Sequence, residues 1–369
     1  MSERLEATTD TSVRRPRTVA WVERAIPLAG VWSLMYAALA AFWAFGGAGF
    51  PFGTASDPGA GVSILASLDQ SAAPAIAAVG LGGAAVALVM TRRARHGRVL
   101  HRALVAFAVL AAVTLALLIP DYRVLMAVAY TPIVLVGAPF GWPRGVGLAD
   151  VWPWPVLNQA VLMAGGLIWA AAGLTYHRRI RGACGHCGRA ATDAGWTTPQ
   201  AAARWGRWAV AVAVGVPIVY AATRLAWAIG LPLGIPQEFL DELQSTGAVV
   251  AGAALGAMGL GGALLTLGLV QRWGEVFPRW MPWVGGRRVP PALATVPASL
   301  VSVLVTTAGL MFVRLQVTGT VRDLFGFLPG GWAALGPELL WPLWGVALAA
   351  ATLAYHYRRR GPCGHCGRP

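Results

Sequence analysis

Charged residues are scarce in this chain. Of its 369 residues, 12% are charged and 57% are hydrophobic, and the mean hydropathy is +0.60. A soluble domain carries about 25% charged residues. This shortage of charge, together with many long apolar runs, excludes an ordinary soluble domain and indicates a polytopic membrane protein.

Lysine is absent, so arginine supplies all 29 basic residues behind the net charge of +14. These arginines do not form one patch suited to nucleic acid. They cluster between apolar runs, at Arg14–Arg24, Arg92–Arg102, Arg178–Arg181 and Arg358–Arg360. Such clusters are typical of cytoplasmic loops, where positive charge fixes the orientation of membrane helices and attracts anionic lipid headgroups. We therefore expect a lipid bilayer and no nucleic acid as partner.

Motifs of the common enzyme classes are also missing. The sequence contains no H-E-x-x-H, no nucleophile elbow, no phosphate loop and no carboxylate pair at catalytic spacing. We do not expect an enzyme on this basis, although cysteine chemistry, treated below, stays open.

Eight segments are long and apolar enough to span a bilayer, or nearly so, since a span needs about 20 residues. They are Ala25–Phe45, Ala72–Met90, Ala103–Ile119, Val156–Leu174, Trp208–Leu231, Gly247–Val270, Ala292–Val313 and Leu339–Tyr355. A further apolar stretch, Val124–Gly137, has 14 residues and contains Pro132. It fits a re-entrant or interfacial segment better than a span.

Charge supports this topology. With eight spans and the N-terminus inside, 24 of the 29 arginines face the cytoplasm. Counting Val124–Gly137 as a ninth span would instead place Arg178–Arg181 outside. We therefore expect a multi-pass protein of the bacterial plasma membrane with both termini in the cytoplasm.

The sequence repeats itself. "YHRRIRGACGHCGR" begins at Tyr176 and "YHYRRRGPCGHCGR" begins at Tyr355; "GLGGA" follows both Val79 and Met258. Four such landmarks recur in one order and predict a duplicated unit of four helices. The expected divisions are a cytoplasmic tail (1–24), a first repeat (25–189), a cytoplasmic linker (190–204) and a second repeat (205–369). An even number of helices gives both repeats the same orientation.

The first helix of each half closes with a W-A-x-G pattern, in "FWAFGG" and "AWAIG". With an arginine-rich end after each four-helix unit, this pattern resembles a family of uncharacterised actinobacterial integral membrane proteins. The absence of lysine is likewise typical of a GC-rich genome. The resemblance implies a membrane bundle and adds no chemistry.

Each repeat ends in a C-G-H-C-G-R cassette. The four cysteines of the chain are Cys184, Cys187, Cys363 and Cys366. A C-x-x-C pair followed by glycine has the shape of a zinc knuckle, and two knuckles supply four thiolates. Since both cassettes are expected on one side of the membrane, we predict that the four cysteines bind one zinc ion and join the repeats.

Two alternatives to zinc remain at this point. A C-x-x-C pair can be a redox dithiol, although cytoplasmic thiols are kept reduced, and the cysteines can also be free of metal. Histidines near the cassettes are candidate neighbours of the metal or helix-capping groups: His177, His186, His356 and His365.

A second candidate site is polar and lies in or near the outer half of the membrane. Arg224 falls inside a predicted span, where an arginine is costly and suggests a function. We expect it to pair with Glu238, Asp241 or Glu242. The wider set is Arg123, Arg224, Arg314, Glu238, Asp241 and Glu338.

Three functions follow from these sites. The first is a scaffold or accessory protein with a cytoplasmic zinc clip. The second is a transporter or exporter with a site between the repeats near Arg224. The third is a membrane redox or lipid-directed enzyme that uses the C-x-x-C pairs. No substrate can be named from the sequence.

Overall fold

The chain folds into long helices without β-sheet. The computed structural model describes residues 19–92, 97–141, 145–185, 187–189, 195–320 and 331–367, with side chains from Arg24 onward. These residues form no strand and only one isolated β-bridge, between Val276 and Arg288. The all-α membrane fold is therefore confirmed.

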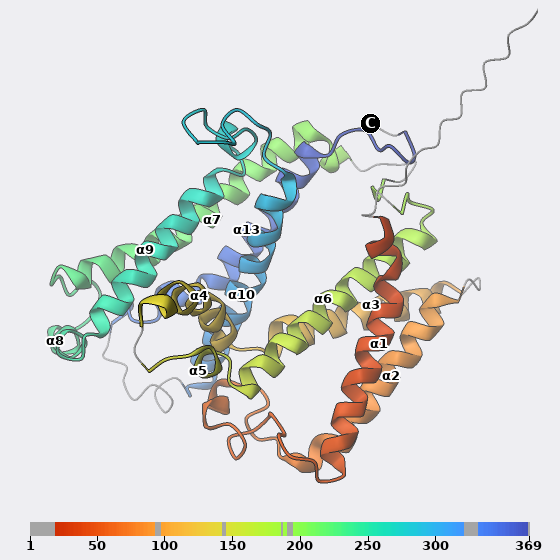
Figure 1. The fold of residues 1–369 in the computed structure, drawn as a ribbon, viewed down its shortest axis with the longest axis horizontal. Helices are drawn as coiled ribbons and strands as arrows, with labels where there is room; N and C mark the ends of the chain where they lie inside the picture. The colour runs from red at the N-terminus through yellow and green to blue at the C-terminus, as the bar shows by residue number, and fades with distance from the viewer. Residues whose placement is uncertain are drawn as a thin grey trace, which may run out of the picture.

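Nine helices have 16 or more residues, and three shorter ones connect them among the described residues (Figure 1). The long ones are α1 (Val19–Ala44), α2 (Ala73–Thr91), α3 (Arg98–Val113), α4 (Tyr122–Gly137), α6 (Trp154–Ile180), α7 (Pro199–Ala228), α9 (Ala248–Leu267), α10 (Pro291–Thr318) and α13 (Trp341–Arg359). The short ones are α5 (Leu148–Val151), α8 (Gln237–Ser245) and α12 (Gly336–Leu339). Proline begins many of them because its fixed φ suits the first turn and its missing N–H has no partner to lose there.

Eight helices are long and apolar enough to cross a membrane, which is the expected number but not the expected set. Tyr122–Phe140, which contains α4, meets these criteria, whereas α13 does not. The first and last turns of α13 contain tryptophan, proline, histidine and arginine. Its middle is packed between α7 and α10, so it needs less hydrophobicity than a helix that faces lipid.

α13 still runs the length of the second half. At its start, the ring of Trp341 lies 5.8 Å from that of Tyr220 on α7. Near its end, the hydroxyl of Tyr355 donates a hydrogen bond of 2.7 Å to the carbonyl of Gly274, beyond the end of α9. These contacts support the role of α13 as the last membrane-crossing helix.

α4 lies beside the start of α6, although its length and composition qualify it as a span. Just before α4, the N–H of Asp121 donates to Gln159, near the start of α6. After α4, Trp152 donates to Thr131 in the middle of α4, and α6 begins two residues later. The residue before α4 and the middle of α4 thus both lie near the start of α6, and α3 still packs against α6.

The two halves of the chain pack in the same order. In the first half α1 contacts α2 and α6, and α3 contacts α6. In the second half α7 contacts α9 and α13, and α10 contacts α13. The duplication itself stays a prediction, which this matching order of neighbours supports.

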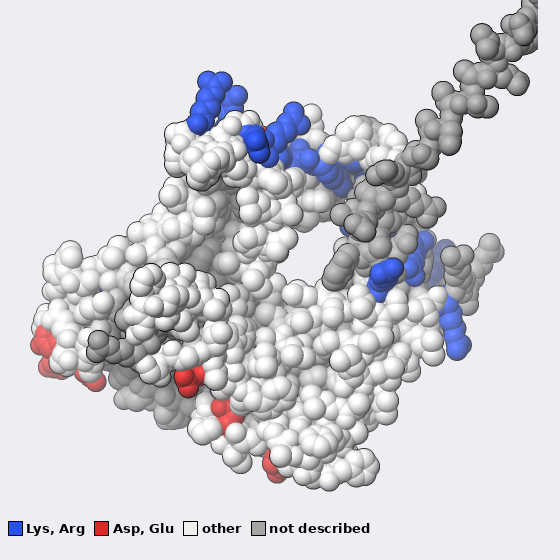
Figure 2. Space-filling model, in the orientation of Figure 1, with Lys and Arg blue, Asp and Glu red and all other residues white. Residues whose placement is uncertain are grey.

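Contacts between the halves lie mainly at one end. After Val113, α3 continues as a π-helical segment, Thr114–Leu118. Thr307 of α10 donates a hydrogen bond of 3.0 Å to the carbonyl of Ala116 in that segment. Val62 also packs with Met311 and Leu315 of α10. Figure 2 shows an opening between the halves beyond this junction.

Charge divides the molecule by end. Figure 2 shows the exposed arginines gathered at one end, where α6 and α13 finish, and the exposed acidic residues at the opposite end. We call the first end the arginine face.

Candidate metal centre

The two cassettes begin where α6 and α13 end, and they form the same turn. The N–H of Gly188 donates to the carbonyl of Cys184 at 2.8 Å, and the N–H of Gly367 donates to that of Cys363 at 2.8 Å. Both glycines have a left-handed backbone, with φ of 72° and 68°. A residue with a side chain is strained in this region, which explains the glycine after each C-x-x-C pair.

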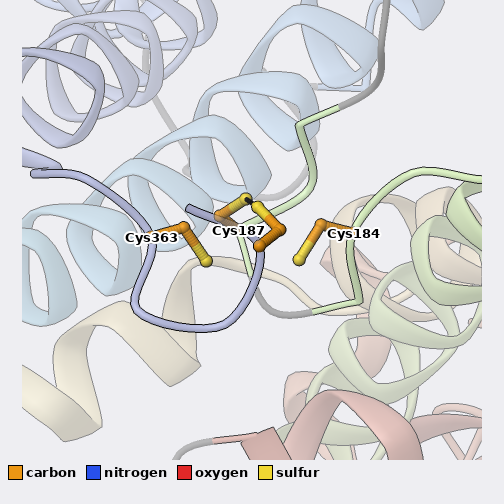
Figure 3. Close-up of side chains that lie close together, drawn as sticks. Cys184, Cys187 and Cys363 are labelled. Atoms are coloured by element: carbon orange, nitrogen blue, oxygen red, sulfur yellow. Dashed lines mark hydrogen bonds between the residues drawn. The ribbon is translucent and has the colours of Figure 1, made fainter. Parts of the chain in front are cut away.

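These turns bring the four sulfurs together from opposite ends of the chain. All four Sγ atoms lie within 4.8 Å of one another, and the Sγ atoms of Cys187 and Cys366 are 3.6 Å apart. A zinc–sulfur bond of about 2.3 Å gives tetrahedral sulfurs a separation of about 3.8 Å. The arrangement therefore matches a four-thiolate metal centre (Figure 3).

Both cassettes also contribute backbone and arginine contacts around the sulfurs. Cys363 is buried, and the other three cysteines are half-buried. The N–H of Cys184 donates to the carbonyl of Arg189 at 2.9 Å. The buried guanidinium of Arg189 crosses to the second cassette and donates to the carbonyl of Gly361 at 3.2 Å. The cluster is thus held by contacts between the cassettes as well as within each one.

The thiols of this cluster differ in acidity. Backbone N–H groups of Cys366 and His365 stabilise the thiolate of Cys363 and lower its pKa to about 6. Desolvation raises the pKa of Cys187 to about 12, and hydrogen bonds to the neighbouring thiols add to this effect. Thiolates this close repel one another, so a divalent cation is needed to stabilise all four in the ionised form.

Zinc fits this donor set because it prefers thiolate ligands in tetrahedral geometry. The four cysteines would fill all four positions of such an ion, which is the arrangement of a structural zinc centre rather than of a catalytic one. The 3.6 Å contact joins one cassette to the other. It is longer than a disulfide bond, and none of the four cysteines forms a disulfide.

The described histidines do not join the cluster of metal-ligating groups, which consists of the four cysteines. The ring of His177 stacks on that of His101, with centroids 6.0 Å apart. The rings of His356 and Tyr357 have centroids 6.0 Å apart. The backbone N–H of His365 faces the sulfur of Cys363. His186 lies outside the described residues.

The polar residues predicted as a second site separate into groups. Arg224 forms an ion pair with Glu338 of α12, not with the acidic residues of α8. Glu238 lies in the exposed first turn of α8, and Asp241 accepts a hydrogen bond from Gln237 at 2.8 Å. The expected pairing of Arg224 is therefore wrong. α8 packs its apolar side inward and leaves its acids in the exposed positions.

A cavity of about 190 Å³ adjoins Arg224. Its lining comes from α7, α8, α9 and the segment before α12: Arg224, Trp227, Phe239, Leu243, Ala248, Val249, Gly252 and Ala334. All of these residues belong to the second half, so this cavity is not between the halves.

Arg123 forms a separate charged group in the first half. Its guanidinium contacts Asp57 at 2.7 Å and Asp121 at 2.8 Å. Arg314 comes from the second half and donates to the backbone carbonyl of Val62. Arg314 thus helps to hold the junction of the halves, whereas the ion pairs of Arg123 lie within the first half and that of Arg224 within the second.

Sequence reasoning missed the buried amides at the start of α6. Tyr36 donates a hydrogen bond of 3.0 Å to Asn158, and Gln159 both donates to Asp121 and accepts from its N–H. In the register that aligns Tyr176 with Tyr355, Gln159 corresponds to Glu338. A polar residue at the same position of both repeats is the sequence signal that could have identified Gln159 as a buried polar residue.

Comparison of the whole chain with protein-family models, with curated proteins and with solved structures found no match. The resemblance to a family of actinobacterial membrane proteins is therefore untested.

Proposed function

We propose that this chain is a membrane scaffold or accessory protein whose two halves are joined at the arginine face by one structural zinc ion. The observation that carries this proposal is the approach of four cysteine sulfurs, from the ends of α6 and α13, to within 4.8 Å of one another. A metal bound there closes a loop of about 175 residues, and such long-range links restrict the unfolded chain most.

The arrangement of charge supports a cytoplasmic location for the centre. Exposed arginines gather at the end that carries the cassettes, and exposed acidic residues gather at the other (Figure 2). The positive-inside rule assigns such an end to the cytoplasm of a bacterial plasma membrane. Zinc–thiolate centres are stable there because the cytoplasm keeps thiols reduced.

The polar contacts favour structural roles over transport. Arg224 is neutralised by Glu338 and is also bonded to two backbone carbonyls. Its neighbouring cavity lies within the second half. A transport site between the repeats gains no support from these contacts. Transport and thiol-based enzyme chemistry are therefore the alternative functions if the protein binds no metal.

The test is metal stoichiometry. The protein is purified in detergent, and bound metals are quantified for the wild type, Cys184→Ser and Cys363→Ser. We expect one zinc per chain in the wild type and a loss of at least about tenfold in zinc affinity in either variant. Gly364→Ala is a control in the same loop, because a Cβ there meets no neighbour within 4 Å.

Other stoichiometries would contradict the proposal. Wild-type protein without metal would leave redox or inert thiols. Two zinc ions per chain would mean that each cassette completes its own site with other ligands. One ion of another metal per chain, lost in either cysteine variant, would contradict zinc as the bound metal but not the link between the two halves.

A further inference from the structure

The connection between α9 and α10 is longer than its counterpart in the first half. It covers residues 268–290, whereas the connection between α2 and α3 covers residues 92–97. Each connection follows a span that ends at the arginine face. The second half therefore carries an additional element, and we call residues 275–289 the Trp–Arg hairpin.

The Trp–Arg hairpin has a defined backbone. The N–H of Phe277 donates to the carbonyl of Arg287 at 3.0 Å, and the N–H of Gly286 donates back to Phe277 at 2.9 Å. At the base, the N–H of Val289 donates to the carbonyl of Glu275 at 2.9 Å. These cross-chain bonds hold the tip in one place.

The base of the hairpin is fixed to the end of α13. The guanidinium of Arg359 donates to the carbonyls of Glu275, at 3.1 Å, and Val289, at 2.8 Å. The carboxylate of Glu275 also contacts Arg358 at 3.4 Å. The helix that leads into the second cassette thus sets the position of the hairpin at the arginine face, where it appears as the teal loop in Figure 1.

Two tryptophans at the tip are almost fully exposed. Trp280 is 81% exposed and Trp283 is 90% exposed. Trp283 also has a left-handed backbone, with φ of 63°, in a three-residue turn closed by the N–H of Val284 and the carbonyl of Pro282 at 2.8 Å. This conformation is strained for a bulky residue. The strain and the exposed indole suggest that the tip contacts something outside this chain.

Three exposed arginines flank these tryptophans in the sequence: Arg279, Arg287 and Arg288. The acid of the hairpin, Glu275, lies at its base with Arg358 and Arg359. No ion pair joins a described carboxylate to the three exposed arginines. Among the described residues, the tip is therefore a cationic and aromatic surface that no carboxylate neutralises.

We propose that the tip of the Trp–Arg hairpin binds the headgroups of anionic phospholipids in the leaflet at the arginine face. Tryptophan prefers the interface between headgroups and acyl chains. Each arginine near an anionic surface adds a favourable interaction. The short connections to α9 and α10 hold the hairpin next to the ends of two membrane spans, within reach of headgroups. A soluble acidic protein is the competing partner.

The experiment uses fluorescence quenching in lipid nanodiscs. All discs contain phosphatidylcholine with about a third phosphatidylglycerol, and they differ only in which lipid carries bromine, a quencher of tryptophan. The contribution of the hairpin is the difference between the wild type and W280F/W283F. We expect brominated phosphatidylglycerol to quench this contribution at least about twofold more than the same fraction of brominated phosphatidylcholine.

The arginines are tested with the triple variant R279Q/R287Q/R288Q, which should lose the preference for the anionic lipid. The matched control is R98Q/R204Q/R207Q, which removes three exposed arginines from the same face but leaves the hairpin intact. It should keep the preference. All variants must retain the metal content and elution volume of the wild type, so that a folding defect is recognised.

Two results would overturn the proposal. Equal quenching by both lipids would mean interfacial contact without recognition of anionic headgroups. No quenching by either lipid would mean that the tip points into water, as expected for a surface that binds a soluble partner. Because metal content is measured separately, failure here is distinguishable from failure of the zinc clip.

Discussion

Arg224 is the residue at which burial and charge conflict most directly. It is 7% exposed, and its guanidinium lies between the rings of Tyr220 and Trp227, 4.5 and 4.4 Å from their centroids. The ion pair with Glu338 and the carbonyls of the segment before α12 satisfy its other donors. The arginine is thus tolerated because every charged partner it needs lies within one half of the molecule.

Removal of one member of this pair should be strongly destabilising. Arg224→Ala leaves the carboxylate of Glu338 buried without its cation, and we expect the free energy of unfolding in detergent to fall by about 3–5 kcal/mol. The double variant Arg224→Met/Glu338→Leu should regain most of the loss because no charge stays buried. Denaturant unfolding followed by circular dichroism measures both. Equal losses in the single and double variants would show that packing, and not charge, determines the effect.

The thiols of the metal centre predict a pH dependence. Cys187, with a pKa raised to about 12 by desolvation, must lose a proton when metal binds. Cys363, with a pKa lowered to about 6 by backbone N–H groups, is already ionised at neutral pH. Protons compete with the metal, so lower pH weakens binding. As the pH falls from about 8 to about 6.5, the apparent Kd for zinc should rise about tenfold per pH unit for each proton that binding releases.

Competition with a chromophoric chelator at constant ionic strength gives this Kd at each pH. The number of protons released comes from calorimetry in two buffers of different ionisation enthalpy. An affinity independent of pH would contradict binding by the thiolates.

At the scale of elements, the repeated "GLGGA" motif packs differently in its two copies. A Cβ on Gly80 of α2 would lie 2.9 Å from the Cβ of Ala37 and 3.0 Å from the carbonyl oxygen of Ser33, both on α1. In the second half, a Cβ on the equivalent Gly259 would lie 3.8 Å from the Cβ of Pro217, which is ordinary contact. Close backbone approach thus explains the motif in α2 and not in α9.

This difference gives a matched pair of substitutions in one helix. Gly80→Ala should destabilise the protein by about 1–3 kcal/mol, because α1 and α2 must move apart. Gly82→Ala should be neutral or stabilising by up to about 1 kcal/mol, since its Cβ would enter open space and alanine favours helix. Thermal unfolding in detergent compares the two. A similar loss in both variants would contradict tight packing at Gly80.

α4 and α13 show where composition is a poor guide to topology. α4 is apolar enough to span, but the contacts of Asp121 and Trp152 return the chain to one end of α6. α13 is too polar at its ends to qualify as a span by composition, but α7 and α10 cover its middle. Hydropathy measures the preference of a segment for lipid, whereas crossing depends on what surrounds it.

At the scale of the whole molecule, the topology and the metal centre can be tested together. The chain has four cysteines, all in the cassettes, so thiol labelling reports on that site alone. A membrane-impermeant maleimide should label inside-out vesicles, and only after zinc is removed by a chelator. Right-side-out vesicles should stay unlabelled in both conditions. Labelling of right-side-out vesicles would reverse the topology, and equal labelling without chelator would contradict bound metal.

The sequence by itself determined the class of this protein and the composition of its candidate metal centre. Long apolar segments commit the chain to membrane helices, because backbone groups in lipid must be satisfied within a helix. The duplicated cassette identified Cys184, Cys187, Cys363 and Cys366 as candidate ligands, because C-x-x-C followed by glycine is a local pattern with a local conformation.

Tertiary structure decided which distant groups meet. The partner of Arg224 is Glu338, 114 positions later, and the nearby acids of α8 stay exposed. The sulfurs of Cys187 and Cys366 approach across 179 positions. Such contacts depend on how helices pack side by side, and helical periodicity carries no information about neighbours. The sequence of each segment therefore identifies its helices and its candidate ligands. Which residues of different helices come into contact is decided only when the helices pack together.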